Sequence, residues 1–238
     1  MKITMLDHMK ELAEINEEKV PDGILNKRRN FFYHAIDGKE VGITRNPDLI
    51  SELCRKKYLL IRKKQLENNL RHFNKLDVST PEEIIRSLPS AYQGLPKSYF
   101  FHPSIKRWLI EPYQRNPYPL KGKGYKFNGT IFRSKSESMI ANVLYNNNIP
   151  YRYEAAIRLG NHTKYPDFIA KNPYTGKEFV WEHFGALHEQ EYIQKMNNKL
   201  DLYMKYGYIP FKTLICTFET EIEDLDRIQR LIENVILG

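Results

Sequence analysis

The sequence predicts a mixed α/β fold in its second half, preceded by a mainly helical and basic first half. After residue 130 the apolar patterns follow the order helix, strand, strand, strand, helix, strand, helix, which favours a mixed sheet covered by helices. Hydrophobic residues make up 41% of the 238 residues, enough for a substantial core. We therefore expect a basic region over residues 1–129 and an α/β domain over residues 130–238.

Positive charge is concentrated in the first half of the chain. The net charge is +8, yet residues 133–238 carry 13 Lys and Arg against 14 Asp and Glu, whereas residues 1–132 carry 24 against 15. This asymmetry predicts a polyanion-binding region joined to an acid-bearing core. The alternative is a solvated basic surface without a partner.

Neither the cysteines nor the apolar runs indicate secretion or membrane insertion. Cys54 and Cys216 are far apart and match no disulfide or metal pattern. The first residues are amphipathic and acidic, unlike a signal peptide, and no apolar run reaches the ~18 residues of a membrane span. We expect a cytoplasmic protein that does not bind membranes.

The first elements are predicted from apolar spacing and capping residues. Residues 5–18 have helical spacing, residues 24–35 are basic and aromatic, and residues 41–44 suggest a short strand or extended piece. Asn46 is a suitable cap for a long helix from Pro47 to about Asn74, because proline favours the first helical position.

Two basic triplets lie on this long helix, seven residues apart. Seven residues are about two turns, so the triplets face nearly the same direction and could follow a phosphate backbone. An ordinary solvated face explains them equally well. Together with the arginine that opens the second half, the candidate nucleic-acid-binding residues are Arg55, Lys56, Lys57, Arg62, Lys63, Lys64 and Arg133.

Residues 79–129 combine one clear helix start with a long irregular stretch. Ser79 or Thr80 precedes Pro81, which predicts a helix that ends by Pro89. Beyond it, Pro, Gly, aromatic and basic residues alternate, and we expect little regular structure except a short helix over residues 104–110. Such a composition suits stacking on nucleic-acid bases, although rings packed on a domain surface are the more common outcome.

The second half supplies the elements of the α/β domain. Ser134 or Ser136 caps a helix that extends to about Asn146. Gly207 ends a later helix as its C-terminal cap. The remaining predicted elements are strands over residues 149–159, 165–170, 177–184 and 210–218, and helices over residues 187–206 and 224–236.

Three acids occupy unusual positions in this domain. Glu137 lies in the first turn of a helix, and Asp167 and Glu182 lie in apolar strands, where an unpaired carboxylate is costly. Each has a structural explanation by itself, but carboxylates from a helix and two strands are what a hard divalent cation requires. The main-chain carbonyl of His183 is a further candidate metal ligand, and Glu154 is either a secondary site acid or an ordinary residue at a strand end.

The segments SKSE, YE, YPDF and WEHFG, in this order of elements, resemble the PD-(D/E)XK nuclease superfamily over residues 130–237. The resemblance implies a restriction-endonuclease-like αβββαβα core with a mixed sheet and a phosphodiesterase site dependent on Mg²⁺ or Mn²⁺. It assigns Glu137 as the acid of the first helix, Asp167 as the central metal ligand and Glu182 as the acid of the following strand.

One position departs from the family pattern. The family has a lysine two residues after the last acid, where this chain has Phe184. Lys199 is the favoured replacement, because it shares a helical face with Tyr192 and Tyr203. The candidate lysines are Lys199, Lys195 and Lys135.

The favoured function is therefore a Mg²⁺-dependent endonuclease that hydrolyses DNA, bound by the basic first half. The sequence does not distinguish DNA from RNA, and a homodimer is compatible with it. One alternative is an inactive nuclease-fold module that only binds nucleic acid, which Phe184 favours. The other is an assembly protein whose basic helix binds an acidic partner.

Overall fold

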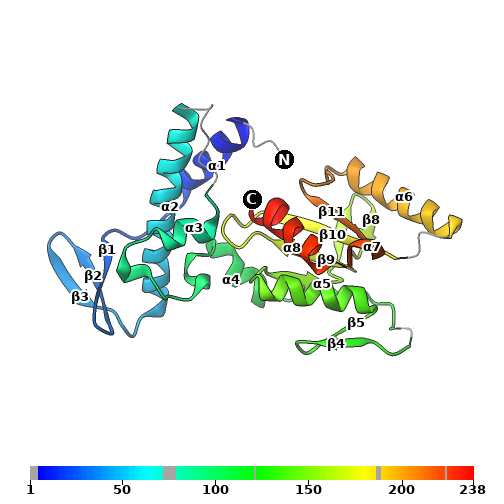
Figure 1. Ribbon diagram of the computed structural model, residues 1–238, viewed down its shortest axis with the longest axis horizontal. Helices are drawn as coiled ribbons and strands as arrows, with labels where there is room; N and C mark the ends of the chain where they lie inside the picture. Colours follow the sequence, from blue (N-terminus) through cyan, green and yellow to red (C-terminus); the bar gives the residue numbers. More distant parts are fainter. Residues whose placement is uncertain (1–4, 72–78, 121, 186–188, 223) are drawn as a thin grey trace. The chain divides into compact units, whose positions relative to one another are not determined.

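A computed structural model describes residues 5–71, 79–120, 122–185, 189–222 and 224–238 (Figure 1). The chain divides into two compact units, residues 1–102 and 103–238, which we call unit 1 and unit 2. This boundary lies well before the expected one at residue 129. The reason is that Trp108 and Phe132 belong to the hydrophobic clusters of the second unit, so the segment between them packs there.

Unit 1 contains the two longest helices of the first half, α1 (Met5–Glu17) and α2 (Pro47–Arg71). Both agree with the predicted helices, and Asn46 Oδ1 accepts a hydrogen bond from the main-chain N–H of Leu49, as an N-cap does. The predicted end of α2 at Asn74 lies outside the described residues. The buried side of α2 includes Leu53, Tyr58 and Leu66.

A three-stranded antiparallel sheet lies between these helices in the sequence, where only a short extended piece was expected. Its strands are β1 (Ile24–Arg28), β2 (Phe31–Ile36) and β3 (Lys39–Gly42), in the order β1-β2-β3. Two-residue turns connect them, and three of the four turn residues have positive φ. Such turns match the twist of hairpin strands. The first half is therefore not as purely helical as predicted.

The rest of unit 1 consists of short helices. Helix α3 (Pro81–Arg86) begins at Thr80, whose hydroxyl accepts from the Glu83 N–H while the Glu83 carboxylate accepts from the Thr80 N–H. This capping box confirms the predicted helix start. The 3₁₀ turns η1 (Ser90–Tyr92) and η2 (Lys97–Phe100) follow in the stretch that was expected to be irregular.

Unit 2 begins with α4 (Pro103–Ile110), close to the predicted helix, and the hairpin β4 (Tyr125–Phe127) and β5 (Thr130–Phe132), which was not predicted. Helix α5 (Lys135–Asn146) follows, and the Ser134 hydroxyl accepts from the Glu137 N–H. Of the two predicted caps, Ser134 is therefore the correct one.

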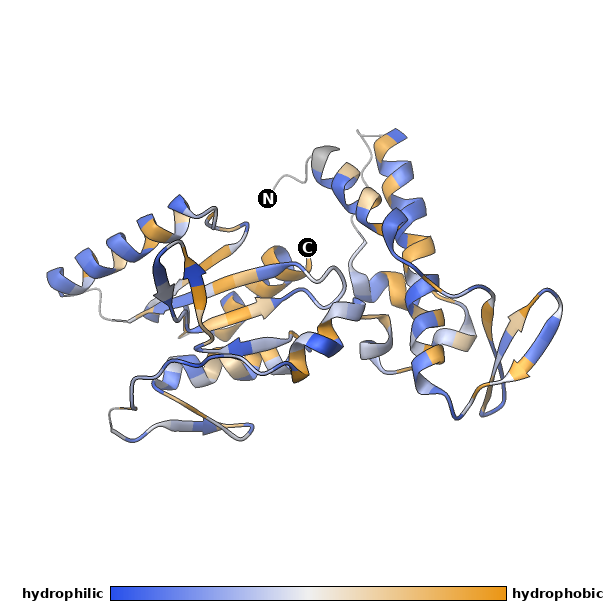
Figure 2. Cartoon of the chain, turned by 180° about the vertical axis from the view of Figure 1, so that it is seen from behind, coloured by the Kyte–Doolittle hydropathy of each residue, from blue (hydrophilic) through white to orange (hydrophobic). Residues whose placement is uncertain are grey.

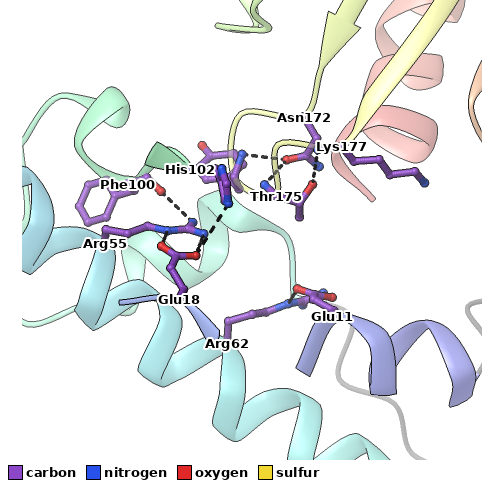
Figure 3. A network of polar contacts seen from close by, with 10 residues as sticks. Glu11, Glu18, Arg55, Arg62, Phe100, His102, Asn172, Thr175 and Lys177 are labelled. Carbon is purple, nitrogen blue, oxygen red and sulfur yellow. Dashed lines mark hydrogen bonds and ion pairs between the residues drawn. The ribbon is translucent and has the colours of Figure 1, made fainter. Parts of the chain in front are cut away.

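The central sheet of unit 2 has four strands in the order β11-β10-β9-β6. Strand β10 (Glu178–Phe184) pairs antiparallel with β9 (Phe168–Lys171) and parallel with β11 (Leu214–Phe218), and β6 (Tyr151–Tyr153) pairs antiparallel with β9. The predicted mixed sheet is thus present. In the turn between β9 and β10, Asn172 Oδ1 accepts from the Thr175 N–H (Figure 3).

The predicted strand over residues 149–159 is divided in two. Glu154 has φ 50°, a left-handed conformation that is unfavourable for a residue with a side chain and interrupts the strand. The chain therefore leaves β6 and forms a separate hairpin of β7 (Ile157–Leu159) and β8 (His162–Lys164).

Helices cover both faces of the central sheet. On one face, Phe168 and Trp181 pack with α5, α8 (Leu225–Leu231) and the π-helical turn η3 (Ile232–Leu237). On the other, Val180 and Leu214 pack with α6 (Gln190–Lys205) through Tyr203. In Figure 2 the strands of this sheet are mainly hydrophobic, whereas α6 alternates between polar and apolar residues. Because successive side chains of a strand point to opposite faces, every second residue of a central strand faces α6.

The last predicted strand begins at Leu214 and not at Pro210. The expected start of α6 at Leu187 lies outside the described residues, and Gly207, with φ 87°, follows Tyr206, the C-cap residue of α6. The short helix α7 (Glu219–Ile222) was not predicted, and α8 begins directly after its N-cap, Asp224.

No helix in the described part of the chain combines the length and the apolar composition that a membrane span requires.

Candidate active site

Glu182 is a buried carboxylate that faces α6. It lies on β10 two residues after Val180, so both side chains lie on the α6 side of the sheet. It is only 1% exposed. Lys199 Nζ donates to its Oε2 at 2.6 Å, and the Tyr203 hydroxyl donates to its Oε1 at 2.5 Å. Both carboxylate oxygens thus have a donor from the same helix, from residues one turn apart.

Asp167 is attached to the end of the same strand. It comes directly before β9 and is partly buried, and its Oδ2 accepts a hydrogen bond of 2.6 Å from the His183 N–H. The pairing of β9 with β10 ends at Phe168 and Trp181. The Asp167 side chain then adds one more hydrogen bond between the two strands. Burial, and then the neighbouring charge of Glu182, raise the pKa of Asp167 well above its ordinary value.

Glu137 approaches from α5. The Tyr153 hydroxyl donates to its Oε2 at 2.5 Å and the Arg133 N–H at 3.0 Å. Its place in the first turn of α5 is favourable for a negative charge. Its charge also contributes to raising the pKa of Asp167, so the two carboxylates lie within electrostatic reach of each other.

The structure therefore brings Asp167 and Glu182 together beside Lys199, with Glu137 within electrostatic reach of Asp167. Burial by itself would lower the pKa of Lys199, but the charges of Glu182 and Asp167 raise it above its ordinary value, which keeps the ammonium protonated. Burial also raises the pKa of Glu182, against the opposing effect of Lys199. Because one ammonium cannot neutralise two carboxylates, the cluster favours a further positive charge.

This donor set fits a sparsely coordinated Mg²⁺ better than a closed metal centre. No group of three or more His, Cys, Asp or Glu side chains within the described residues is arranged to hold a metal ion. Mg²⁺ commonly uses one or two carboxylates and completes its shell with water and phosphate oxygens. Asp167 and Glu182 supply two carboxylates, and a carboxylate oxygen that already accepts one hydrogen bond retains a second acceptor position.

The imidazole of His183 lies away from this cluster, as the alternation of the strand predicts. Its Nδ1 is 3.2 Å from Thr217 Oγ1 and its Nε2 is 3.0 Å from Glu219 Oε2. The Ser136 hydroxyl donates to the same carboxylate of Glu219. Ligation of a metal by the main-chain carbonyl of His183 stays a prediction.

Of the three candidate lysines, only Lys199 contacts a site acid. Lys195 forms an exposed pair with Glu191, one turn along α6. Lys135 is exposed in the first turn of α5. Phe184, at the position of the family lysine, is buried and packs on Phe218 with ring centroids 6.0 Å apart.

Glu154 and Arg133 form a buried structural link next to the site. Arg133 Nε and Asn116 Nδ2 both donate to Glu154 Oε1, at 2.5 and 2.7 Å. Arg133 also donates to the carbonyls of Tyr118 and Pro119, which fastens the segment before β4 to the sheet. This use of its guanidinium favours a structural role over contact with nucleic acid.

The basic triplets of α2 are used largely within unit 1 (Figure 3). Arg55 Nε and Nη2 donate to the two oxygens of Glu18 at 2.7 Å each, and Arg62 forms the same fork with Glu11 at 2.7 and 2.8 Å. The two arginines are seven residues apart on α2, and their partners are seven residues apart in the opposite direction. The shared face was therefore predicted correctly, but it packs against the first helical segment.

The other members of the triplets divide into bonded and exposed side chains. Lys56 Nζ donates to the Gly23 carbonyl at 2.8 Å, and Lys63 Nζ donates to Asn16 Oδ1 at 2.6 Å. Lys57 is half-buried and Lys64 is exposed. Nucleic-acid binding by these two lysines stays a prediction.

Two tyrosines that hold the site acids were not predicted in that role. Tyr203 was recognised only as a residue on the face of Lys199. Its spacing of four residues from that lysine is the signal that both reach the same carboxylate. Tyr153, next to Glu154 in the YE segment, gives no comparable signal, because its contact with Glu137 depends on how α5 lies against the sheet.

Comparison with known proteins gives no relative: no family model, no curated protein and no solved structure matches this chain.

Proposed function

We propose that the chain is a Mg²⁺- or Mn²⁺-dependent endonuclease that hydrolyses phosphodiester bonds in DNA, with its site at Glu137, Asp167, Glu182 and Lys199. The contact that carries the proposal is the hydrogen bond from Lys199 Nζ to Glu182. The family pattern requires a lysine beside this acid, and here a helix supplies the lysine that the strand lacks. The order α5, β6, β9, β10, α6, β11, α8 supports the same restriction-endonuclease-like reading.

The residues divide the chemistry between them. Asp167 and Glu182 would hold the divalent cation, which when bound neutralises phosphate charge and makes water a better nucleophile. Lys199 would stabilise the negative charge that develops on the phosphate oxygens. Glu137, held by Tyr153, would orient the attacking water.

The ionisation of Asp167 links the site to its cation. Because burial and Glu182 raise its pKa, proton loss is unfavourable until a positive charge arrives. A divalent cation reverses this effect by favouring the carboxylate. In the absence of Mg²⁺, the site therefore holds a proton more readily than an ordinary aspartate does.

Cleavage of supercoiled plasmid with Mg²⁺ or Mn²⁺ tests the proposal directly. The wild-type protein should nick the plasmid, and Asp167→Ala should not. A single-stranded RNA of the same length and a linear duplex serve as parallel substrates and decide between DNA and RNA. Equal cleavage by both proteins, or by neither at any metal concentration, contradicts the catalytic assignment.

The alternative of an inactive nucleic-acid-binding module has one observation in its favour. Both oxygens of Glu182 accept hydrogen bonds from α6, a closed arrangement that a purely structural ion pair would also adopt. Binding without cleavage in the plasmid assay would support it. The assembly-protein alternative is weaker, because Arg55 and Arg62 of its basic helix are already paired with Glu18 and Glu11.

A further inference from the structure

The sheet of unit 1 presents an exposed face of mixed aromatic and basic character. The register pairs Arg28 with Phe31 and Asn26 with Tyr33, so these four side chains lie on the same face. Leu25, on the opposite face, is buried against the unit. Phe31 is 58% exposed, and we call the surface of Arg28, Phe31 and Tyr33, with the turn between the first two strands, the tip face.

The ring of Phe31 lies largely in water at the end of the first hairpin, whereas Tyr33 is half-buried. Figure 1 shows the three strands projecting from the helices of unit 1. Ile24, at the other end of the same face, is 55% exposed and extends the apolar surface. A contiguous exposed patch of this kind commonly marks a binding surface.

Two cations accompany the rings of the tip face. Arg28 lies on this face, and Arg29 follows it in the two-residue turn with φ 55°. The Arg28 guanidinium is 5.4 Å from the centroid of the Tyr33 ring, a cation–π contact that holds the charge over the sheet. Lys27, whose Nζ is 5.4 Å from the centroid of the Phe32 ring, lies on the opposite face.

The charge of the segment favours a polyanion. Residues 24–45 contain five Lys and Arg against two acids, Asp37 and Glu40. Glu40 accepts from Arg28 at 2.6 Å and from Asn26 at 2.6 Å, so it competes with any anion for the tip face. Exposed aromatic rings beside cations are the combination that stacks unpaired bases and neutralises phosphates.

We propose that the tip face binds single-stranded nucleic acid, with a base stacked on Phe31 and phosphates beside Arg28 and Arg29. The choice of nucleic acid as partner rests on the proposed function. The nucleic-acid interface of unit 1 would thus lie on the sheet and not on α2, because Arg55 and Arg62 form ion pairs within the unit. We expect an unpaired base, because stacking on the ring of Phe31 needs a base with a free face, and the bases of a duplex are already stacked on one another.

Binding is measured on the full chain by fluorescence anisotropy with a labelled oligonucleotide of about 15 nucleotides. EDTA prevents cleavage, so the result does not depend on catalysis. The double variant R28Q/R29Q should weaken binding roughly tenfold at ~0.1 M salt and should reduce the salt slope by about 1.4, as two lost phosphate contacts on a single strand require. F31S should weaken binding roughly tenfold and leave the slope unchanged.

The matched control removes two exposed cations from α1 and the segment that follows it instead. K10Q/K19Q has the same charge change as R28Q/R29Q and should alter affinity less than about twofold. E40Q should strengthen binding several-fold, since it frees Arg28, and a misfolded variant would not bind more tightly. Urea denaturation of each variant shows whether unit 1 is intact.

Three outcomes overturn the proposal. They are an equal loss of affinity in K10Q/K19Q, an F31S variant that binds normally, and tighter binding to anionic phospholipid vesicles than to the oligonucleotide. Failure of the endonuclease proposal looks different: the plasmid stays intact in Mg²⁺ while oligonucleotide binding in EDTA still responds to Phe31 and Arg28.

Discussion

Both units place cations against partly or fully buried carboxylates, but the number of cations for each carboxylate differs. In unit 1 each arginine has one carboxylate, Arg55 with Glu18 and Arg62 with Glu11. In unit 2, Lys199 faces two acids, Glu182 and Asp167, and Glu137 lies within electrostatic reach of Asp167. The paired charges of unit 1 fasten helices together, whereas the surplus of acids in unit 2 leaves a requirement for positive charge. Charge balance separates the structural ion pairs from the candidate catalytic ones.

The largest expected effect on cleavage comes from removing the charge of Asp167, one of the acids that outnumber the cation of the unit 2 cluster. Asp167→Asn keeps an oxygen to accept from the His183 N–H but loses the charge, so cleavage should fall by at least about 100-fold in the plasmid assay. Asp201→Asn, on the exposed side of α6, is the matched control and should cleave normally. Normal cleavage by the Asp167 variant would mean that the surplus of acids is not catalytic.

The same substitution should stabilise unit 2. The pKa of Asp167 is raised on folding, so the native state holds its proton more tightly than the unfolded chain does. Stability is therefore lost as pH rises from the ordinary aspartate value through the raised one. Above that window the variant should resist urea better than the wild type, and Mg²⁺ should stabilise only the wild type. A variant that is less stable at every pH would contradict this linkage.

The next effect tests the balanced pairs of unit 1. Arg55→Met leaves the largely buried Glu18 without its fork, and should lower the free energy of unfolding by about 3 kcal/mol. Arg62→Met, whose partner is more exposed, should lower it by about 1 kcal/mol. Urea denaturation measures both. If Arg55→Met folds normally but loses oligonucleotide binding, the pair is functional and the comparison between the units fails.

Removing the single cation of the unit 2 cluster should affect activity and stability together. Lys199→Met should lower cleavage by about 100-fold and, because the lysine is partly exposed, should cost about 2 kcal/mol of stability. Lys199 lowers the pKa of Glu182, so the stability loss should grow as pH rises. Lys195→Met on the same helix should change neither property, since its pair with Glu191 is exposed. Full cleavage by the Lys199 variant would point to a different lysine.

The sequence predicted more of unit 2 than of unit 1, and the difference has physical reasons. Asp167 and Glu182 could be identified because a charge inside an apolar strand is costly and needs an explanation. Lys199 could be selected because helical spacing is regular. The pairing of Arg55 with Glu18 was missed, because nothing local shows that two helices separated by a sheet will lie against each other.

The errors in the fold have a similar origin. Strands β1 and β3 are short and lack regular apolar alternation, so the apolar spacing predicted only an extended piece over residues 41–44 and not the sheet. The break at Glu154 has no sequence signature, since glutamate rarely adopts a positive φ. Its conformation is maintained by hydrogen bonds from Arg133 and Asn116, which lie in other segments.

The smallest expected effect on cleavage concerns the hydroxyl that completes the Glu182 site. Tyr203→Phe removes one hydrogen bond to a buried carboxylate and should cost about 1.5 kcal/mol. Because this hydrogen bond lowers the pKa of Glu182, its loss should move the acid limb of the cleavage profile to higher pH, a change that a purely structural role would not produce. Tyr208→Phe, whose ring packs edge-on against that of Tyr203, is the matched control and should leave the limb in place. An unchanged limb in the Tyr203 variant would show that Glu182 does not need to ionise for cleavage, and would leave Asp167 as the acid whose charge controls the rate.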